Sequence, residues 1–205
     1  AVALVQPTTD FGSVVITGPA TIEKDSAAAT YEVPYTATYT MSDTLLNMLK
    51  RAPRGVPMTF VVELDSRLTA KKDDNGNFRY NFNGDGILEV DKSNITVSPD
   101  GHTITVVCKP VADWTTAIGG KTSVKMTLTG TGVLAAENFA AGEYLNTTGH
   151  IVGMIDQSTS VLIPANLCRT KMIGRYDVIF DWNDGSNKKK TVSVVEGGTV
   201  GDQMP

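Results

Sequence analysis

The chain of 205 residues lacks any apolar run long enough to span a bilayer, and its longest basic run is the three lysines at 188–190. A membrane-spanning helix needs about 20 consecutive apolar residues. A nucleic-acid-binding surface needs a basic patch, whereas this chain has a formal net charge of −4. We therefore expect neither membrane insertion nor nucleic-acid binding. The basic start and apolar core of a signal peptide are also missing, although residues 1–3 could remain from such a cleavage.

Residues that carry catalysis or bind transition metals are few. The two histidines, His102 and His150, are isolated, and neither belongs to a metal-site spacing such as HExxH. The chain also has no GxSxG turn to present a nucleophilic serine. We predict a protein that is not an enzyme and that needs no cofactor.

Cysteine is equally scarce, because Cys108 and Cys168 are the only two and no CxxC spacing exists. If the two thiols are bonded, the closed loop would contribute roughly 4 kcal/mol to stability. Alternatively, each is a small buried hydrophobic residue that never meets the other. Sequence spacing does not determine the separation of two Cα atoms, so both interpretations stay open.

Alternation of apolar and polar residues is the dominant pattern. Residues 94–108 contain Ser98-Pro99-Asp100-Gly101, which is typical of a type I turn. Apolar residues occupy every second position on both sides of it: Ile95, Val97, Ile104, Val106 and Cys108. A period of two predicts an antiparallel hairpin with one buried face.

Other segments repeat this pattern, and together they predict the fold class. Residues 31–40 alternate most clearly, and 57–64 and 122–129 read as further strands. One convincing helix is expected at 42–51, with Ser42 as its N-cap. Residues 113–118 could add a helical turn, and 135–148 look like the loosest region. Short strands, turn residues and little helix predict an all-β protein, an immunoglobulin-like antiparallel β-sandwich with one short helix.

A near-motif for calcium occurs where polar residues recur at alternate positions. The candidate ligands are Asn81, Asn83 and Asp85, followed by Gly86. The pattern departs from a calcium loop, because Lys92 stands where a bidentate carboxylate belongs. A glycine-rich hairpin turn explains the same residues, and we expect no metal site. The preceding Asn75-Gly76 pair predicts a type I′ hairpin turn.

Aromatic residues offer an alternative function. The candidates for stacking on a sugar ring are Tyr35, Tyr39, Trp114 and Trp182. In the clearest strand, however, Val33 and Ala37 share a face with the tyrosines, which is the pattern of a core. A carbohydrate-binding module that uses exposed aromatics is therefore the alternative interpretation.

Residues 174–205 resemble the first half of a Listeria–Bacteroides repeat, the internalin-type B-repeat of bacterial surface proteins. The matching positions are Tyr176, Val178, Phe180, Asp181, Asn183, Gly185, Val192, Val194, Gly197, Gly198, Val200 and Pro205. Asp184 stands where the family usually has glycine, and the aromatic second half is absent. The alternation predicts a hairpin that turns at 183–185.

The resemblance implies a division into a β-sandwich domain, residues 1–170, and a partial repeat hairpin of β-grasp-like type, residues 171–205. It further implies a non-catalytic extracellular module of a bacterial cell-surface protein, adhesive or structural, located on the cell surface or in the cell wall. The expected partner is a host or cell-wall glycan or protein.

Overall fold

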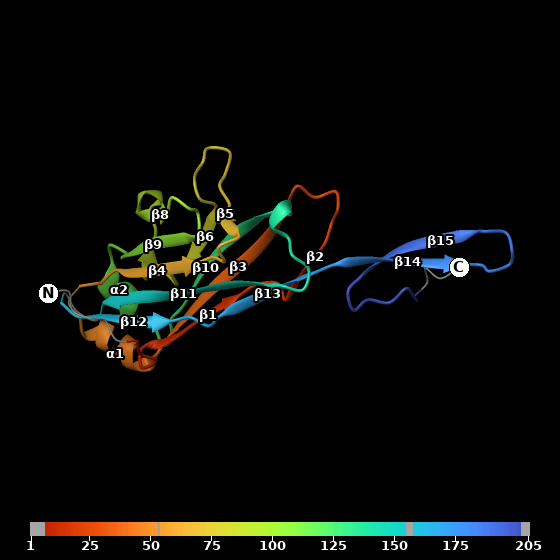
Figure 1. Ribbon diagram of the computed structural model, residues 1–205. Coiled ribbons are helices and arrows are strands. Elements are labelled where there is room, and N and C mark those ends of the chain that lie inside the picture. The colour runs from red at the N-terminus through yellow and green to blue at the C-terminus, as the bar shows by residue number, and fades with distance from the viewer. Residues whose placement is uncertain (1–6, 53, 155–157, 202–205) are drawn as a thin grey trace.

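Two β-sheets pack face to face and enclose the hydrophobic core (Figure 1). The computed structural model describes residues 7–52, 54–154 and 158–201, so residues 1–3 and Pro205, interpreted above, lie outside it. The five-stranded sheet contains β1 (Gly12–Thr17), β3 (Thr30–Met41), β10 (Lys125–Ala135) and β5 (Leu68–Ala70) in this order, with β6 (Tyr80–Asn83) also beside β10.

The second sheet has eight strands among the described residues. Its main order is β2 (Thr21–Glu23), β13 (Cys168–Ile173), β11 (Tyr144–Met154), β4 (Met58–Glu63), β9 (Thr103–Pro110) and β7 (Leu88–Glu89). Two short strands complete it: β12 (Ser160–Pro164) beside β11, and β8 (Ile95–Val97) beside β9. All pairs are antiparallel except β2 with β13.

The predicted alternation fills the core from both sheets. In β3 the buried positions are Tyr31, Val33, Tyr35, Ala37, Tyr39 and Met41. The facing sheet contributes Met58, Phe60 and Val62 from β4, and Ile104, Val106 and Cys108 from β9. The predicted hairpin is confirmed, because Ile95 pairs with Val106 and Val97 with Ile104.

Two short α-helices lie at one end of the sandwich (Figure 1). Helix α1 (Asp43–Arg51) begins as predicted, since the Ser42 side chain accepts a hydrogen bond from the N–H of Leu45 at 3.2 Å. Leu45 and Leu49 are buried. The second helix, α2 (Trp114–Gly119), occupies the predicted helical turn. Two 3₁₀ turns, η1 (Lys92–Asn94) and η2 (Ala136–Asn138), complete the helical segments described.

Strand β11 corrects the expectation of a loose region at 135–148 for residues 144–148. Its buried positions are Leu145, Thr147, Gly149, Ile151 and Gly153. Threonine and glycine hide the apolar alternation, although the strand is central in its sheet. Glycine is needed here, because a Cβ at position 149 would lie 2.2 Å from the carbonyl oxygen of Val61.

The turn at Asn75-Gly76 also differs from the prediction. A type I′ turn needs positive φ at both central residues, but of these two only Gly76 has it, with φ 79°. The side-chain oxygen Oδ1 of Asp73 instead accepts the N–H groups of Asn75 and Asn77, each at 2.9 Å. This local side-chain bonding replaces the two-residue turn with a wider one.

The predicted C-terminal hairpin forms a sheet of its own, β14 (Arg175–Asp181) paired with β15 (Lys189–Val195). It projects from the end of the sandwich opposite the two helices (Figure 1). The boundary expected at 170/171 falls inside β13, which runs on to Ile173. Gly174 alone separates β13 from β14, and an ion pair of 3.4 Å joins Arg175 to Glu23 on β2.

Candidate functional site

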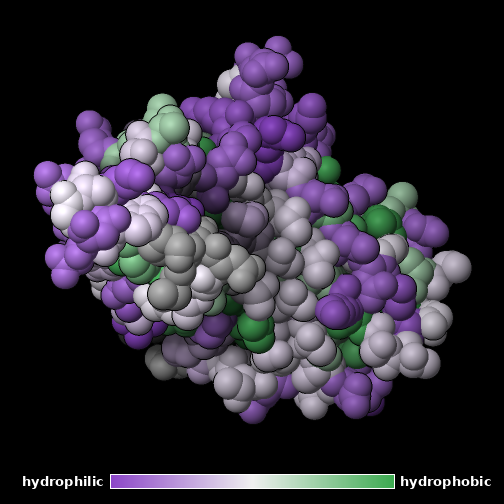
Figure 2. Space-filling model, turned by 90° about the vertical axis from the view of Figure 1, so that its right-hand side faces the viewer, coloured by the Kyte–Doolittle hydropathy of each residue, from purple (hydrophilic) through white to green (hydrophobic). Residues whose placement is uncertain are grey.

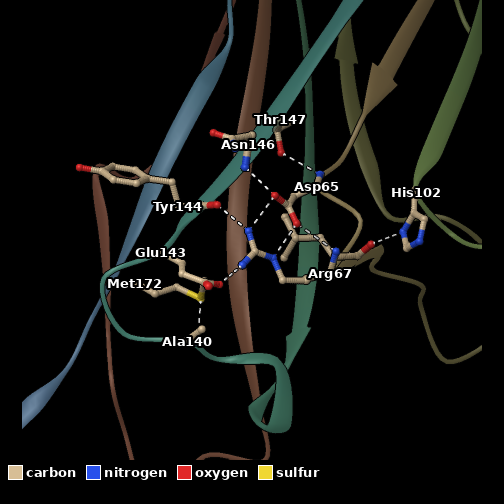
Figure 3. A network of polar contacts seen from close by, with 10 residues as sticks. Asp65, Arg67, His102, Ala140, Glu143, Tyr144, Asn146, Thr147 and Met172 are labelled. Carbon is tan, nitrogen blue, oxygen red and sulfur yellow. Dashed lines mark hydrogen bonds and ion pairs between the residues drawn. The ribbon is translucent and has the colours of Figure 1, made fainter.

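A buried carboxylate anchors the start of β5. Asp65 Oδ1 accepts hydrogen bonds from the N–H of Arg67 at 3.0 Å and from its Nε at 2.9 Å, and Oδ2 accepts from Nη2 at 3.1 Å (Figure 3). Oδ2 also accepts the N–H of Asn146 on β11 at 2.8 Å. The Asp65 side chain is 8% exposed, so four hydrogen bonds compensate for the loss of water around its charge.

Arg67 extends this network to the opposite loop. Its Nη1 lies 2.7 Å from Oε2 of Glu143, and its Nη2 donates to the carbonyl oxygen of Tyr144 at 2.5 Å (Figure 3). The connection between β4 and β5 is therefore fixed to the beginning of β11. The alternation of residues within a single strand does not reveal a contact between segments so far apart in the sequence.

The same network predicts a pH dependence. Burial alone would raise the pKa of Asp65, but the hydrogen bonds from Arg67 and Asn146 lower it below its usual value. Because the pKa of Asp65 is lower in the folded than in the unfolded state, the stabilisation by its charged form is fully present above the unfolded-state pKa of about 4. It is lost as the pH falls below that value and through the folded-state pKa. We expect the difference in free energy of unfolding between wild type and Asp65→Asn to shrink from pH 7 to pH 3, measured by urea denaturation. A difference that is the same at both pH values would contradict this.

The outer edge of β5 is held by the turn between β8 and β9. The N–H of Ala70 donates to the carbonyl oxygen of Gly101 at 3.0 Å. Nδ1 of His102 lies 2.6 Å from the carbonyl oxygen of Leu68 (Figure 3), so this nitrogen carries the proton. These bonds join the two sheets at this side, and they place the next residues of the chain.

Residues 71–79 form a loop that rises from the end of β5 and returns as β6. In Figure 2 this loop is the hydrophilic projection at the top of the molecule. Its base is fixed, since the N–H of Lys71 donates to the carbonyl oxygen of Thr131 at 2.8 Å and the N–H of Arg79 to that of Lys71 at 3.1 Å. Lys72 and Phe78 form a β-bridge across it. The loop is therefore held at its base by backbone pairing, and it forms one wall of the groove described next.

A groove of about 670 Å³ lies between this wall and the outer face of the five-stranded sheet. The groove is lined by Glu32, Pro34, Tyr35, Thr36, Lys71, Asp73, Phe78, Arg79, Tyr80, Asn81, Lys92, Thr129, Gly130 and Thr131. It combines aromatic, charged and hydroxyl groups, which is the mixture found in small-ligand sites. We treat it as the candidate binding site.

Phe78 and Tyr80 form the aromatic side of the groove. Their ring centroids lie 6.2 Å apart and their planes differ by 8°. Phe78 is wedged over Gly130, where a Cβ would come within 2.9 Å of its ring. A second hollow of about 240 Å³ shares both rings and Lys92 with the groove. Neither ring was singled out from the sequence, although the alternation Phe78, Tyr80, Phe82 was a signal for it.

Of the aromatic residues chosen from the sequence, Tyr35 borders this groove, and Tyr39, Trp114 and Trp182 do not. Tyr35, Tyr39 and Trp114 are 5%, 0% and 5% exposed, so the core interpretation is correct for the two tyrosines, and none of the three offers an exposed stacking face. Tyr39 donates its hydroxyl proton to the carbonyl oxygen of Phe11 at 2.6 Å. Trp182 is 47% exposed, but it lies at the turn of the separate hairpin.

The calcium candidates are engaged in other interactions. Oδ1 of Asp85 lies 3.0 Å from Nζ of Lys121, and its Oδ2 accepts the N–H of Lys125 at 3.0 Å. Oδ1 of Asn83 accepts the N–H of Asp85 at 2.9 Å, and Asn81 is exposed on β6. The carboxylate of Asp85 is thus paired with a lysine ammonium. The expectation of a hairpin turn here is wrong, because β6 pairs with β10 and β7 pairs with β9, so the glycine-rich turn connects the two sheets. Within residues 7–52, 54–154 and 158–201 no three histidine, cysteine, aspartate or glutamate side chains are grouped to hold a metal.

The two cysteines are free and buried. Cys108 pairs with Met58, which pairs with Gly153, whereas Cys168 pairs with Thr147 on the same strand β11. The six residue steps from 147 to 153 span about 20 Å along a strand, well beyond the reach of a disulfide. Of the two open interpretations, separate buried hydrophobic residues is correct.

Burial raises the pKa of the Cys108 thiol to about 12 and also raises that of Cys168. We expect neither thiol of the native protein to react with a chromogenic disulfide at pH 8, and both to react after unfolding in guanidinium. Intact mass should be identical before and after reduction. A native mass lower by two hydrogens would show a disulfide and contradict the structure.

No family model matches the chain, and no curated protein matches it. Solved structures nevertheless share its fold. The 35 kDa C-terminal fragment of the major pilin GBS80 of Streptococcus agalactiae aligns with a TM-score of 0.51 at 9% identity, covering 86% of this chain and 60% of that chain. The chain is an immunoglobulin-like β-sandwich, as predicted.

Two further structures align less closely. The major pilin BcpA of Bacillus cereus has a TM-score of 0.48 at 14% identity, over 88% of this chain and 55% of that chain. The N-terminal domain of the Streptococcus gordonii adhesin Sgo0707 has a TM-score of 0.45 at 15% identity, over 80% of this chain and 33% of that chain. This chain thus spans less than two thirds of each solved chain, and at these identities the likeness concerns the fold alone. No helix among the residues described has the length and apolarity to cross a membrane.

Proposed function

We propose that this chain is a non-catalytic extracellular module of a bacterial cell-surface protein, with an adhesive or structural role. The observation that carries the proposal is the arrangement of two modules in series. The sandwich passes into the hairpin through Gly174 alone, and Arg175 and Lys171 form ion pairs with Glu23 and Glu196 at 3.4 and 3.8 Å across this joint. A short connection held by ion pairs fixes the orientation of one module relative to the next, which suits a stalk. The pilin and adhesin structures that share the fold support the same role.

The hairpin is proposed as the first half of an internalin-type B-repeat. The register supports this, because Tyr176, Val178 and Phe180 share one face with Val194, Val192 and Lys190. Tyr176 is 57% exposed, and on the other face Ile179 is 62% exposed. An isolated two-stranded hairpin is only marginally stable. The exposed side chains of Tyr176 and Ile179 are apolar surface that a further segment of such a repeat would cover.

Surface location tests the proposal directly. Antibodies raised against the purified chain should label intact cells of the source bacterium, and brief protease treatment of those cells should remove the label. Antibodies against a cytoplasmic protein of the same cells serve as the control. Label that appears only after lysis would overturn the proposal.

A carbohydrate-binding role is the second candidate. One observation favours it, namely the groove beside Phe78 and Tyr80, in place of the buried tyrosines considered from the sequence. A ligand in this groove would make the module adhesive, and a host or cell-wall glycan is the partner class that its lining suits.

A further inference from the structure

We infer that the groove beside residues 71–80 binds an acidic saccharide, one that carries carboxylate or sulfate groups. The inference deepens the adhesive form of the proposed function by naming the ligand class. It depends on three features of the groove: an excess of positive charge, an aromatic side, and a floor with two threonines on strands that are paired on both sides.

The charge of the site is opposite to that of the chain. Three cations, Lys71, Arg79 and Lys92, line the groove with two carboxylates, Glu32 and Asp73. The adjoining hollow adds Lys72, which gives four positive and two negative charges, a local net charge of +2 in a chain of net charge −4. An anionic ligand is therefore attracted to this part of the surface.

Two of the three cations that line the groove itself are available to a ligand. Lys71 forms an ion pair with Glu32, and Oδ1 of Asp73 accepts two N–H groups of its own turn. Within the part of the chain that the structure describes, no ion pair or hydrogen bond engages the side-chain nitrogens of Arg79 or Lys92. Guanidinium and ammonium groups donate charge-assisted hydrogen bonds to carboxylate and sulfate oxygens.

The aromatic side is built to present a flat face. Phe78 is wedged over Gly130, and the ring of Tyr80 is parallel to it within 8°. The Lys72–Phe78 bridge and the two hydrogen bonds of Lys71 hold the loop in place. An aromatic ring on a segment that is already held in place can pack on the apolar face of a pyranose at a reduced entropic cost.

The floor favours a saccharide over an acidic peptide. It is made by Thr36, Thr129 and Asn81, which are consecutive partners across three paired strands, β3, β10 and β6. Thr36 pairs with Thr17 on its other side. Thr36 and Thr129 therefore lie on strands that are paired on both sides, and their backbone cannot accept an added peptide strand, whereas Asn81 lies on β6, which pairs with β10 alone. Hydroxyl and amide side chains suit sugar hydroxyls.

Binding of defined hexasaccharides, measured by isothermal titration calorimetry on the intact chain, tests the inference. The probes are hexamers of galacturonate and of chondroitin sulfate, with maltohexaose as the neutral probe and hexaglutamate as the acidic peptide. We expect at least one acidic hexasaccharide to bind, to bind at least tenfold more tightly than the neutral one, and to weaken as salt rises from about 50 to about 500 mM.

Variants then locate the site. Arg79→Gln with Lys92→Gln should weaken binding at least about tenfold, and Tyr80→Ala by about tenfold, because each removes a direct contact. Lys188→Gln and Trp182→Ala, a cation and an aromatic of the hairpin, are the matched controls and should change nothing. Arg79 and Lys92 are exposed, so their substitution should leave the melting temperature unchanged.

The outcomes are distinct. The inference would be overturned if neither acidic hexasaccharide binds, or if the neutral hexamer binds equally tightly. Equal losses of affinity in the hairpin control variants would also overturn it. Hexaglutamate binding as tightly as the saccharides would replace the ligand class with an acidic peptide. None of these results would affect the surface labelling that tests the proposed function, so the two proposals can fail separately.

Discussion

Asp65→Ala is expected to lower the free energy of unfolding by about 3 kcal/mol, because it removes one partner of a buried ion pair and leaves the other partly desolvated. Arg67, 27% exposed, would keep only Glu143 and the Tyr144 carbonyl. The N–H of Asn146 would lose its acceptor at the beginning of β11. Urea denaturation at pH 7, followed by tryptophan fluorescence, measures the effect.

Glu143→Gln is the matched control, since it removes the other carboxylate that contacts the same guanidinium. The Glu143 side chain is 62% exposed, so its ion pair is screened by water and should contribute less than about 1 kcal/mol. If both substitutions cost the same, burial does not distinguish the two carboxylates, and Asp65 is not the anchor of β5.

The strands that sequence analysis identified are those in which local pattern and burial coincide. In β3, β4 and β9 the inward positions are apolar, so the period of two is visible without knowledge of the partner strand. The N-cap at Ser42 is equally local, because a side chain bonds to an N–H three residues away. These elements were sufficient to predict a β-sandwich.

The first part of strand β11, up to Gly149, was missed because its inward residues are determined by contacts with other strands. Thr147 accepts the N–H of Asp65 at 3.4 Å, and Gly149 leaves space for the backbone at Val61. Both requirements come from β4 and from the connection after it, over 80 residues earlier in the sequence for each pair. No window of the sequence around β11 contains them.

The candidate groove could not be predicted from the sequence for a related reason. Its walls come from segments around residues 34, 78 and 130, and pairing with β10 brings them together. Aromatic residues can be counted in a sequence, but their exposure depends on what covers them. Tyr35 and Phe78 both line the groove, yet Tyr35 is buried in the core, whereas the ring of Phe78 packs over Gly130.

Gly149→Ala should be the most damaging single-methyl addition in β11. The new Cβ would meet the Val61 carbonyl oxygen at 2.2 Å and Ile16 Cδ1 at 3.3 Å, and a backbone carbonyl inside a paired sheet cannot rotate away. We expect a loss of at least about 3 kcal/mol, the upper part of the range for overpacking. For a chain of this length that loss lowers the melting temperature by roughly 6–12 °C in differential scanning calorimetry.

Gly119→Ala separates this clash from the general effect of adding a methyl group. Nothing lies within 4 Å of a Cβ at position 119, and the residue is the last of α2. We expect a change of about 0.5 kcal/mol or less, since alanine is accepted in a helix and meets no neighbour. If Gly149→Ala lowers the free energy of unfolding as little as Gly119→Ala does, then β4 and β11 can separate locally to admit a side chain. In that case β11 would not be the fixed centre of its sheet, and the Asn146 and Thr147 contacts that hold Asp65 would give way with it.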